Sequence, residues 1–312
     1  MAGNQRIYKQ KIKATKTLEK VFRAMELIAA SRIGKARAAA QGQDPYTRAL
    51  IRAIGTVAAH TTDLNHPLVT ERDDTNRVAV LVVTSDRGMA GAYSASVLRE
   101  TEALLDRLEE EGKEPQLYVY GRRGEGYFRF RKTHMEQVWT GTSDKPDSET
   151  SHEIAHTLLE RFLAPAEEGG VAELHVVFTR FESMVKQVVQ VRKMMPLEAV
   201  EEEDSFKDLP AGATPEPVGT FDEAPLYDFE PSAEKVFDVL LPMYVSQRIH
   251  AVLLMAAASE LASRQQAMHA ATENAQDLIR DYTRLANNAR QAEITTEITE
   301  LISGADALEN AG

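Results

Sequence analysis

Hydrophobic positions near the start of the chain recur at spacings of three and four residues, which is the period of one helix face. Residues 5–33 contain neither glycine nor proline. The recurring positions in and after this stretch are Leu18, Phe22, Met25, Ala29, Arg32, Ala36 and Ala39. The pattern predicts a long helix with one contact seam. We expect Pro45 to kink a helix that continues to about Val57.

The C-terminal part of the chain repeats this rhythm over a longer distance. Residues 243–303 also lack glycine and proline, and a helix of that length would be ~90 Å long. The predicted seam is Ala257, Leu261, Arg264, Met268, Ala271, Ala275, Leu278, Tyr282, Leu285, Ala289, Ala292 and Thr296. A period near 3.5 predicts supercoiling with another helix, and small seam residues let two helix axes approach closely. The two chain ends are therefore predicted to pair as an antiparallel coiled coil.

Between the two rods, short apolar runs alternate with segments of helical period. The predicted strands are residues 77–85, 116–121, 173–181 and 186–196, with the last two as a possible hairpin, and the predicted helices are residues 94–111 and 151–163. Such alternation favours a mostly parallel sheet with helical crossovers. We expect an α/β domain with a Rossmann-like sheet, inserted at residues 67–230 between coiled-coil helices at 1–66 and 231–312. The acidic stretch that begins at Glu201 is predicted to be a loop.

Charge is distributed unevenly along the 312 residues, whose net charge is −12. The first sixty residues carry +9 and the remainder −21. A basic segment on an acidic chain can bind nucleic acid, anionic lipid or an acidic protein, or can be the solvated face of a helix. The chain has no cysteine, which excludes disulfides and thiolate chemistry. Without a signal-peptide core or a long apolar run, we expect a cytoplasmic protein that reaches any membrane through a partner.

One short motif suggests catalysis. His152, Glu153 and His156 form the pattern HExxH, in which a helix places two histidines for zinc and a glutamate as general base. Glu173 or Glu182 could serve as a third ligand. The alternative is a helix that packs on the sheet, because leucines and a phenylalanine follow the motif. The glycine-containing segments at 85–93 and 121–128 lack the spacing of nucleotide-binding loops, so turn formation is the simpler interpretation.

Several longer segments resemble the gamma subunit of the F-type ATP synthase over essentially the whole chain. They are IKATKTLEKVFRAMELIAASRIGKA, SDRGMAGAYSASV, YDFEPSAEKVFDVLLPMYV, ASELASRQQAMHAATENAQDLI and ARQAEITTEITELISGADAL. The last is similar to the C-terminal signature of that family. Four positions depart from the family pattern: Met89 and Ala90 replace the common Leu-Cys pair, and Glu26 and His269 stand where lysines are usual. The resemblance leaves the zinc interpretation as a weak alternative.

The resemblance implies a non-catalytic rotor shaft that needs no cofactor or metal. It would couple proton-driven rotation of the membrane c ring to conformational cycling of the catalytic beta subunits, and would regulate ATPase activity and proton flow. The implied partners are the alpha and beta subunits, the epsilon subunit and the c ring. Nucleic acid is not expected. The implied location is the cytoplasmic side of the cell membrane, as a peripheral protein.

The resemblance also implies contact positions. Those matching contacts with the alpha/beta ring are Met25, Glu260, Arg264, Met268, Arg290, Gln291 and Thr295, and those matching contacts with the c ring are Tyr227 and Glu230. Two other function classes stay open from residues alone, namely the zinc metallohydrolase and a scaffold that binds nucleic acid through its basic helix. The net charge of −12 weighs against the scaffold.

Overall fold

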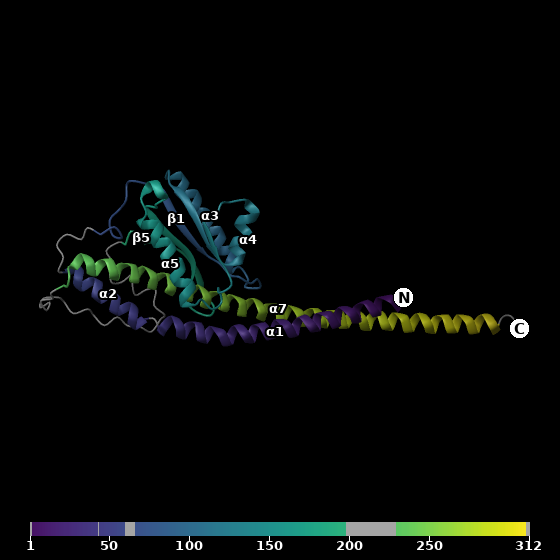
Figure 1. Cartoon of the computed structure of the whole chain (residues 1–312). Helices are drawn as coiled ribbons and strands as arrows, with labels where there is room; N and C mark the ends of the chain where they lie inside the picture. Colours follow the sequence, from purple (N-terminus) through teal and green to yellow (C-terminus); the bar gives the residue numbers. More distant parts are fainter. Residues whose placement is uncertain (1, 43, 60–65, 198–228, 310–312) are drawn as a thin grey trace. The chain divides into compact units, whose positions relative to one another are not determined.

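The computed structural model describes residues 2–42, 44–59, 66–197 and 229–309. The helices are α1 (Ala2–Gly42), α2 (Asp44–Ala59), α3 (Tyr93–Glu110), α4 (Arg122–Arg131), α5 (Ser148–Leu163) and α7 (Ala233–Glu309), with a short 3₁₀ helix at Ala166–Glu168 (Figure 1). The strands are β1 (Arg77–Val83), β2 (Glu114–Tyr120), β3 (Gln137–Trp139), β4 (Glu173–Phe181) and β5 (Gln187–Met195). The chain forms two compact units, one from Met1–Ala29 with Gln265–Gly312, and the other from Ala30–Arg264.

The second unit is built on a five-stranded sheet with the order β3-β2-β1-β4-β5. Four strands are parallel, and only β5 runs antiparallel, as the second arm of a hairpin with β4. Helices α3, α4 and α5 connect the parallel strands as crossovers. The predicted α/β architecture is therefore confirmed.

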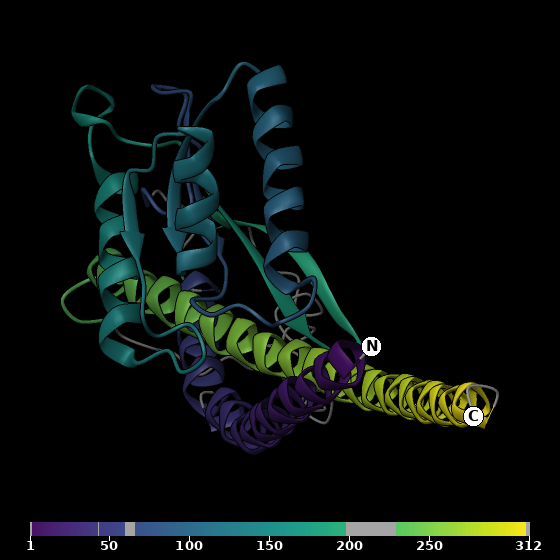
Figure 2. The same ribbon diagram turned by 90° about the vertical axis from the view of Figure 1, so that its right-hand side faces the viewer.

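Alternation along β1 divides the hydrophobic core between the two faces of this sheet. Ala79, Leu81 and Val83 belong to one buried cluster, which also contains residues of α2, α5 and α7. Val78, Val80 and Val82 belong to the other, which contains residues of α3 and α4. Figure 2 shows these layers, with α3 and α4 on one side of the sheet. A strand covered on both faces must be apolar at every position, which explains the continuous run RVAVLVV.

Three elements were missed by the sequence analysis, namely α4, the three-residue strand β3 and the short 3₁₀ helix at Ala166–Glu168. Residues 121–128 were interpreted as a glycine turn, but the turn is confined to Gly121, which has a φ of 102°, and α4 begins at the next residue. A Cβ atom at Gly121 would lie 2.3 Å from the Thr84 carbonyl oxygen. A Cβ at Gly124, inside α4, would lie 2.8 Å from a Val119 methyl carbon. The glycines thus permit α4 to pack closely on β1 and β2.

The predicted kink near Pro45 falls beside residue 43, which lies outside the described residues. Pro45 occupies the first turn of α2, which begins at Asp44, and its missing N–H costs little there. At the other end of the chain, α7 starts ten residues before the predicted rod and includes Pro242 in its interior. Burial of Phe237, Leu241 and Val245 in the core anchors this part of the helix despite the proline.

Part of α7 is long and apolar enough to cross a membrane by length and composition. Within Ala233–Ser303, a window of 18 residues has a mean hydropathy of 1.4, and half of that window is buried inside the protein. The buried core residues Leu253 and Ala256 belong to this helix. Packing on the sheet is therefore a sufficient reason for its hydrophobicity.

The first unit consists of the ends of α1 and α7. Three contacts join them: His269 Nδ1 lies 3.0 Å from Glu26 Oε1, Gln276 Nε2 donates to Glu19 Oε1 at 3.0 Å, and Lys11 Nζ lies 5.3 Å from the ring centroid of Tyr282. Successive partners run backward along α1 and forward along α7. The predicted antiparallel pairing is therefore confirmed (Figure 1).

The contact seam differs from the predicted one in detail. On α1, Leu18 is 51% exposed, while its neighbour Glu19 contacts α7. On α7, the predicted seam residues Met268 and Ala275 are buried, but Leu278 and Leu285 are 46% and 37% exposed. Thr272 and Ala286, which were not in the predicted seam, are buried as well. Small side chains fill the seam because they let the two backbones approach, and several large apolar side chains are left on the outer surface.

Candidate functional site

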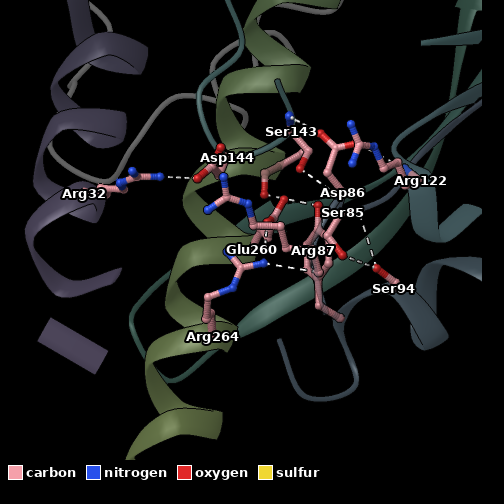
Figure 3. Close-up of polar contacts among 12 residues, drawn as sticks. Arg32, Ser85, Asp86, Arg87, Ser94, Arg122, Ser143, Asp144, Glu260 and Arg264 are labelled. Carbon is pink, nitrogen blue, oxygen red and sulfur yellow. Dashed lines mark hydrogen bonds and ion pairs between the residues drawn. The ribbon is translucent and has the colours of Figure 1, made fainter. Parts of the chain in front are cut away.

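An aspartate in the loop after β1 organises the polar end of the sheet. Asp86 Oδ2 accepts hydrogen bonds from the backbone N–H groups of Gly141 at 2.8 Å and Ser143 at 2.9 Å. Asp86 Oδ1 accepts from the N–H of Arg122, the first residue of α4, at 3.1 Å. The Asp86 N–H in turn donates to Ser143 Oγ at 2.8 Å. One side chain therefore joins three segments of the chain (Figure 3).

Beside this loop lies a buried ion pair on α7. Arg264 Nη2 donates to Glu260 Oε1 at 2.6 Å, and the two side chains are 7% and 1% exposed. The same nitrogen lies 3.3 Å from the carbonyl oxygen of Arg87, which ties the helix to the loop after β1 (Figure 3). Burial raises the pKa of Glu260 to about 7, although the positive charge of Arg264 opposes this shift. Burying either charge alone would be costly, and here each charge is stabilised by the opposite charge of the other residue.

A second ion pair in the same unit joins α1 to the loop before α5. Arg32 contacts Asp144, and Asp144 follows Ser143 in the segment that Asp86 organises. Figure 3 shows both ion pairs near this segment, with Asp144 belonging to the pair with Arg32. Elements that are distant in sequence therefore converge on residues 141–144.

The structure places the predicted contact positions in three different environments. Glu260, Arg264 and Met268 are buried, and Met25 is half-buried. Arg290, Gln291 and Thr295 are exposed on α7, and the Thr295 hydroxyl donates to the Gln291 carbonyl oxygen at 2.9 Å. Glu230 is exposed just before α7, while Tyr227 lies outside the described residues.

Sequence reasoning missed Asp86, because the segment 85–93 was interpreted only as a turn. A carboxylate that binds N–H groups 36 and more residues away leaves no periodic signal in the sequence. It also missed that Glu26 and His269, two of the departures from the expected family pattern, contact each other. The signal for that pair was available in the sequence. Both residues directly follow a predicted seam residue, and both stand where a lysine was expected.

The zinc interpretation is not supported. His152, Glu153 and His156 are all exposed on α5, and Glu153 accepts a hydrogen bond from Trp139 Nε1 at 3.1 Å. The proposed third ligands are engaged elsewhere, since Glu173 contacts Lys113 and His175, and Glu182 contacts Lys186. Among the described residues, no group of three metal-ligating side chains comes together.

Comparison with known proteins decides the family. A model of the ATP synthase family matches residues 4–308. The chain is 60% identical over 308 residues to the ATP synthase gamma chain of Beutenbergia cavernae, with 99% of both chains covered. It is 51% identical over 311 residues to the ATP synthase gamma chain of Micrococcus luteus, with both chains covered completely. The chain belongs to the ATP synthase gamma chain family.

Membership in the gamma chain family assigns this protein to the non-catalytic part of ATP synthase, because the catalytic sites lie in the beta subunits. The fold agrees with that family. A chain of the Euglena gracilis mitochondrial ATP synthase superposes with a TM-score of 0.60 at 16% identity, covering 99% of this chain and 95% of that one. A chain from the central stalk and c ring of the Tetrahymena thermophila enzyme superposes with a TM-score of 0.54 at 18% identity, covering 80% and 99%.

Proposed function

We propose that this gamma chain is the central rotor shaft of its ATP synthase, which couples proton-driven rotation of the c ring to conformational cycling of the beta subunits. The observation that supports this most directly is the antiparallel pairing of α1 and α7 in a unit of its own. The solved relatives point the same way, because one is described as a central stalk with its c ring and another as a rotor.

The α7 helix continues beyond the start of α1 in this unit. The register of the three contacts places Ala2 opposite about residue 293, so the residues from Ile294 onward have no partner in α1 (Figure 1). Ile298 and Leu301 in this last part are 51% and 74% exposed. Exposed apolar side chains on a lone helix favour an enclosing protein partner. The alpha/beta ring is the partner that the family provides.

The mechanism needs no bond chemistry in this chain. A shaft made of two paired helices carries different side chains on its different sides. As it turns, it therefore presents different contacts to each beta subunit. Each set of contacts stabilises one beta conformation over another, so rotation shifts the populations of conformers in sequence. Coupling then depends on how strongly individual side chains discriminate between those conformers, and not on any group that titrates or transfers protons.

The proposed contacts with the alpha/beta ring divide into accessible and buried positions. Arg290, Gln291 and Thr295 are accessible on α7, and Arg290 can form two parallel hydrogen bonds to a carboxylate. The basic segment of α1 around Met25 can attract an acidic loop of the partner. Such complementary charges mainly speed association and fix the relative position of the two proteins. For Glu260, Arg264 and Met268, the proposal requires a partner loop to reach side chains that the chain itself buries.

The remaining proposed contacts concern the membrane end of the complex. Glu230 is exposed immediately before α7, which suits a contact with the c ring, and Tyr227 is proposed to act beside it. The epsilon subunit is proposed as a further partner. Through these partners the chain would be a peripheral protein on the cytoplasmic side of the cell membrane.

Arg290→Ala tests the proposal. The Arg290 guanidinium has no ion-pair partner among the described residues, so its loss should leave the unfolding midpoint of the isolated chain unchanged. ATP synthesis by membrane vesicles under an imposed proton gradient should fall about tenfold if a buried charged contact is lost. Arg284→Ala is the matched control, because Arg284 is 72% exposed on the same helix and pairs only with Asp281 among the described residues. Unchanged synthesis with Arg290→Ala would refute this contact.

A further inference from the structure

A groove of about 520 Å³ lies between α3 and α4, on the face of the sheet away from α5. Three arginines line it, namely Arg99 from α3 and Arg122 and Arg123 from α4, together with Ser94, Glu102 and Tyr127. We propose that this groove binds a small anion with two or more phosphate groups. The inference concerns the α/β unit alone and does not depend on the shaft function.

The groove is positively charged although the chain as a whole is acidic. None of the three guanidinium groups forms an ion pair with any residue that the structure describes. The one acidic residue in the lining, Glu102, is already engaged by Arg131 and by the Tyr127 hydroxyl. Three cationic groups therefore face a small volume without a compensating charge. Such a local concentration of positive charge can attract an anion even though the chain as a whole has a net charge of −12.

The position of Arg122 and Arg123 is not explained by the stability of the fold. They occupy the first turn of α4, where the helix dipole favours acidic residues and disfavours basic ones by several tenths of a kcal/mol each. The arginines of α4 that pair with acids among the described residues are Arg129 and Arg131, near the other end of the helix. Binding an external anion gives these two residues a role that the fold does not.

The backbone at the start of α4 is not itself the binding group. Its N–H groups are already used: Arg122 N by Asp86 Oδ1, Arg123 N by the Ser85 carbonyl, Gly124 N by Thr84 Oγ1 and Glu125 N by the Gly121 carbonyl. This distinguishes the groove from a glycine-rich phosphate loop, in which backbone N–H groups hold the phosphates. Recognition must come from the arginine side chains.

Phosphate is the anion that fits this donor set best. A guanidinium group presents parallel N–H donors that match the spacing of phosphate oxygens. The volume of about 520 Å³ lies within the range of small-molecule sites and exceeds what one orthophosphate would fill. We therefore infer a diphosphate or longer chain, either inorganic or attached to a nucleoside.

The experiment is calorimetric titration of the full-length chain with pyrophosphate and, separately, with ATP at constant ionic strength. We expect saturable binding of one anion per chain. Arg99→Gln and Arg123→Gln should each weaken it about tenfold, the loss expected for one charge-assisted hydrogen-bonding group. Arg129→Gln is the control, because Arg129 lies on α4, pairs with Glu125 and does not line the groove. Its effect should be less than about twofold.

Each outcome decides between alternatives. Tighter binding of ATP supports a nucleotide, and tighter binding of pyrophosphate supports an inorganic chain. No saturable binding of either anion, or equal weakening by Arg129→Gln, would overturn the proposal. A second measurement needs no substitution: pyrophosphate should protect Arg99, Arg122 and Arg123 of the unaltered chain from phenylglyoxal, while Arg129 stays reactive. Equal modification with and without pyrophosphate would also overturn it.

Discussion

At the scale of single residues, the chain places charge where it must be balanced locally. The resemblance predicted lysines at the positions of Glu26 and His269, and the structure brings these two residues within 3.0 Å of each other. A carboxylate and an imidazole can share a hydrogen bond across the two helices, which two lysines could not. Glu260 and Arg264 show the buried version of the same principle, since each would be costly to bury without the other.

We predict that Glu260 makes the stability of the chain depend on pH. Its pKa of about 7 lies above the ordinary value of 4.5, so the folded state binds more protons than the unfolded state between these values. Stability should therefore fall as pH rises through this window, by at most roughly 3 kcal/mol. Glu260→Gln should flatten this part of the profile, measured as the free energy of urea unfolding from pH 4 to 8. Glu109→Gln, at an exposed position of α3, is the control, and parallel profiles for the parent and Glu260→Gln would contradict the prediction.

At the scale of elements, both terminal helices have more than one apolar face. The seam in the first unit is lined by small and polar residues, and larger side chains such as Leu18, Val21 and Ile28 lie outside it with about half of their surface exposed. Hydrophobic periodicity alone cannot choose between two stripes on one helix. Close approach of the backbones decides, because only small residues fit between the axes.

The register of this helix pair can be tested directly because the chain has no cysteine. Glu19→Cys combined with Gln276→Cys should crosslink efficiently with a short bis-maleimide, since these side chains are hydrogen-bonded across the pair. Glu19→Cys with Asn287→Cys is the control, because the second position is displaced by ~16 Å along α7. Gel mobility of the product under denaturing conditions reports the crosslink. Equal yields from both pairs would exclude the register described here.

At the scale of the whole molecule, the distribution of exposed apolar residues indicates where partners bind. Of the eighteen large hydrophobic residues that are exposed within the described chain, eleven lie in the unit formed by the two chain ends. The same unit includes most of the basic N-terminal segment, although the chain as a whole carries −12. The end of α7 in this unit is acidic, so the basic charge belongs to α1 and not to the unit as a whole. A concentration of exposed apolar side chains of this kind is typical of a subunit that is stable in an assembly.

We predict that the last turns of α7 drive self-association of the isolated chain. Replacing Ile294, Ile298 and Leu301 together by serine should yield a chain that sediments more as a monomer, with unchanged helix content. The same change should weaken retention of the alpha and beta subunits. Phe130→Ser is the control, because Phe130 is 88% exposed in the other unit. Self-association that is unaffected by the triple change, or equally reduced by Phe130→Ser, would contradict this prediction.

Much of the fold was accessible from sequence because its signals are local. The strands β4 and β5 were predicted almost to the residue, since clusters of valine and other strand-forming residues mark them. By contrast, α4 was not predicted, because its glycines and arginines give no helical pattern. Its first turn is stabilised by Asp86, which lies 36 residues earlier. A helix that depends on a distant side chain cannot be recognised from its own residues.

The sequence by itself therefore determined that two long helices flank an α/β domain, and its motifs identified the family. These conclusions rest on local signals, namely helical periodicity, the absence of glycine and proline, and apolar strand runs. Such signals depend only on residues that are close together in the chain. Only the tertiary structure decided which stripe of each helix becomes the seam, that Glu260 and Arg264 are buried, and that three arginines line one groove. Those features arise from contacts between residues far apart in the chain, whose energies no local pattern records.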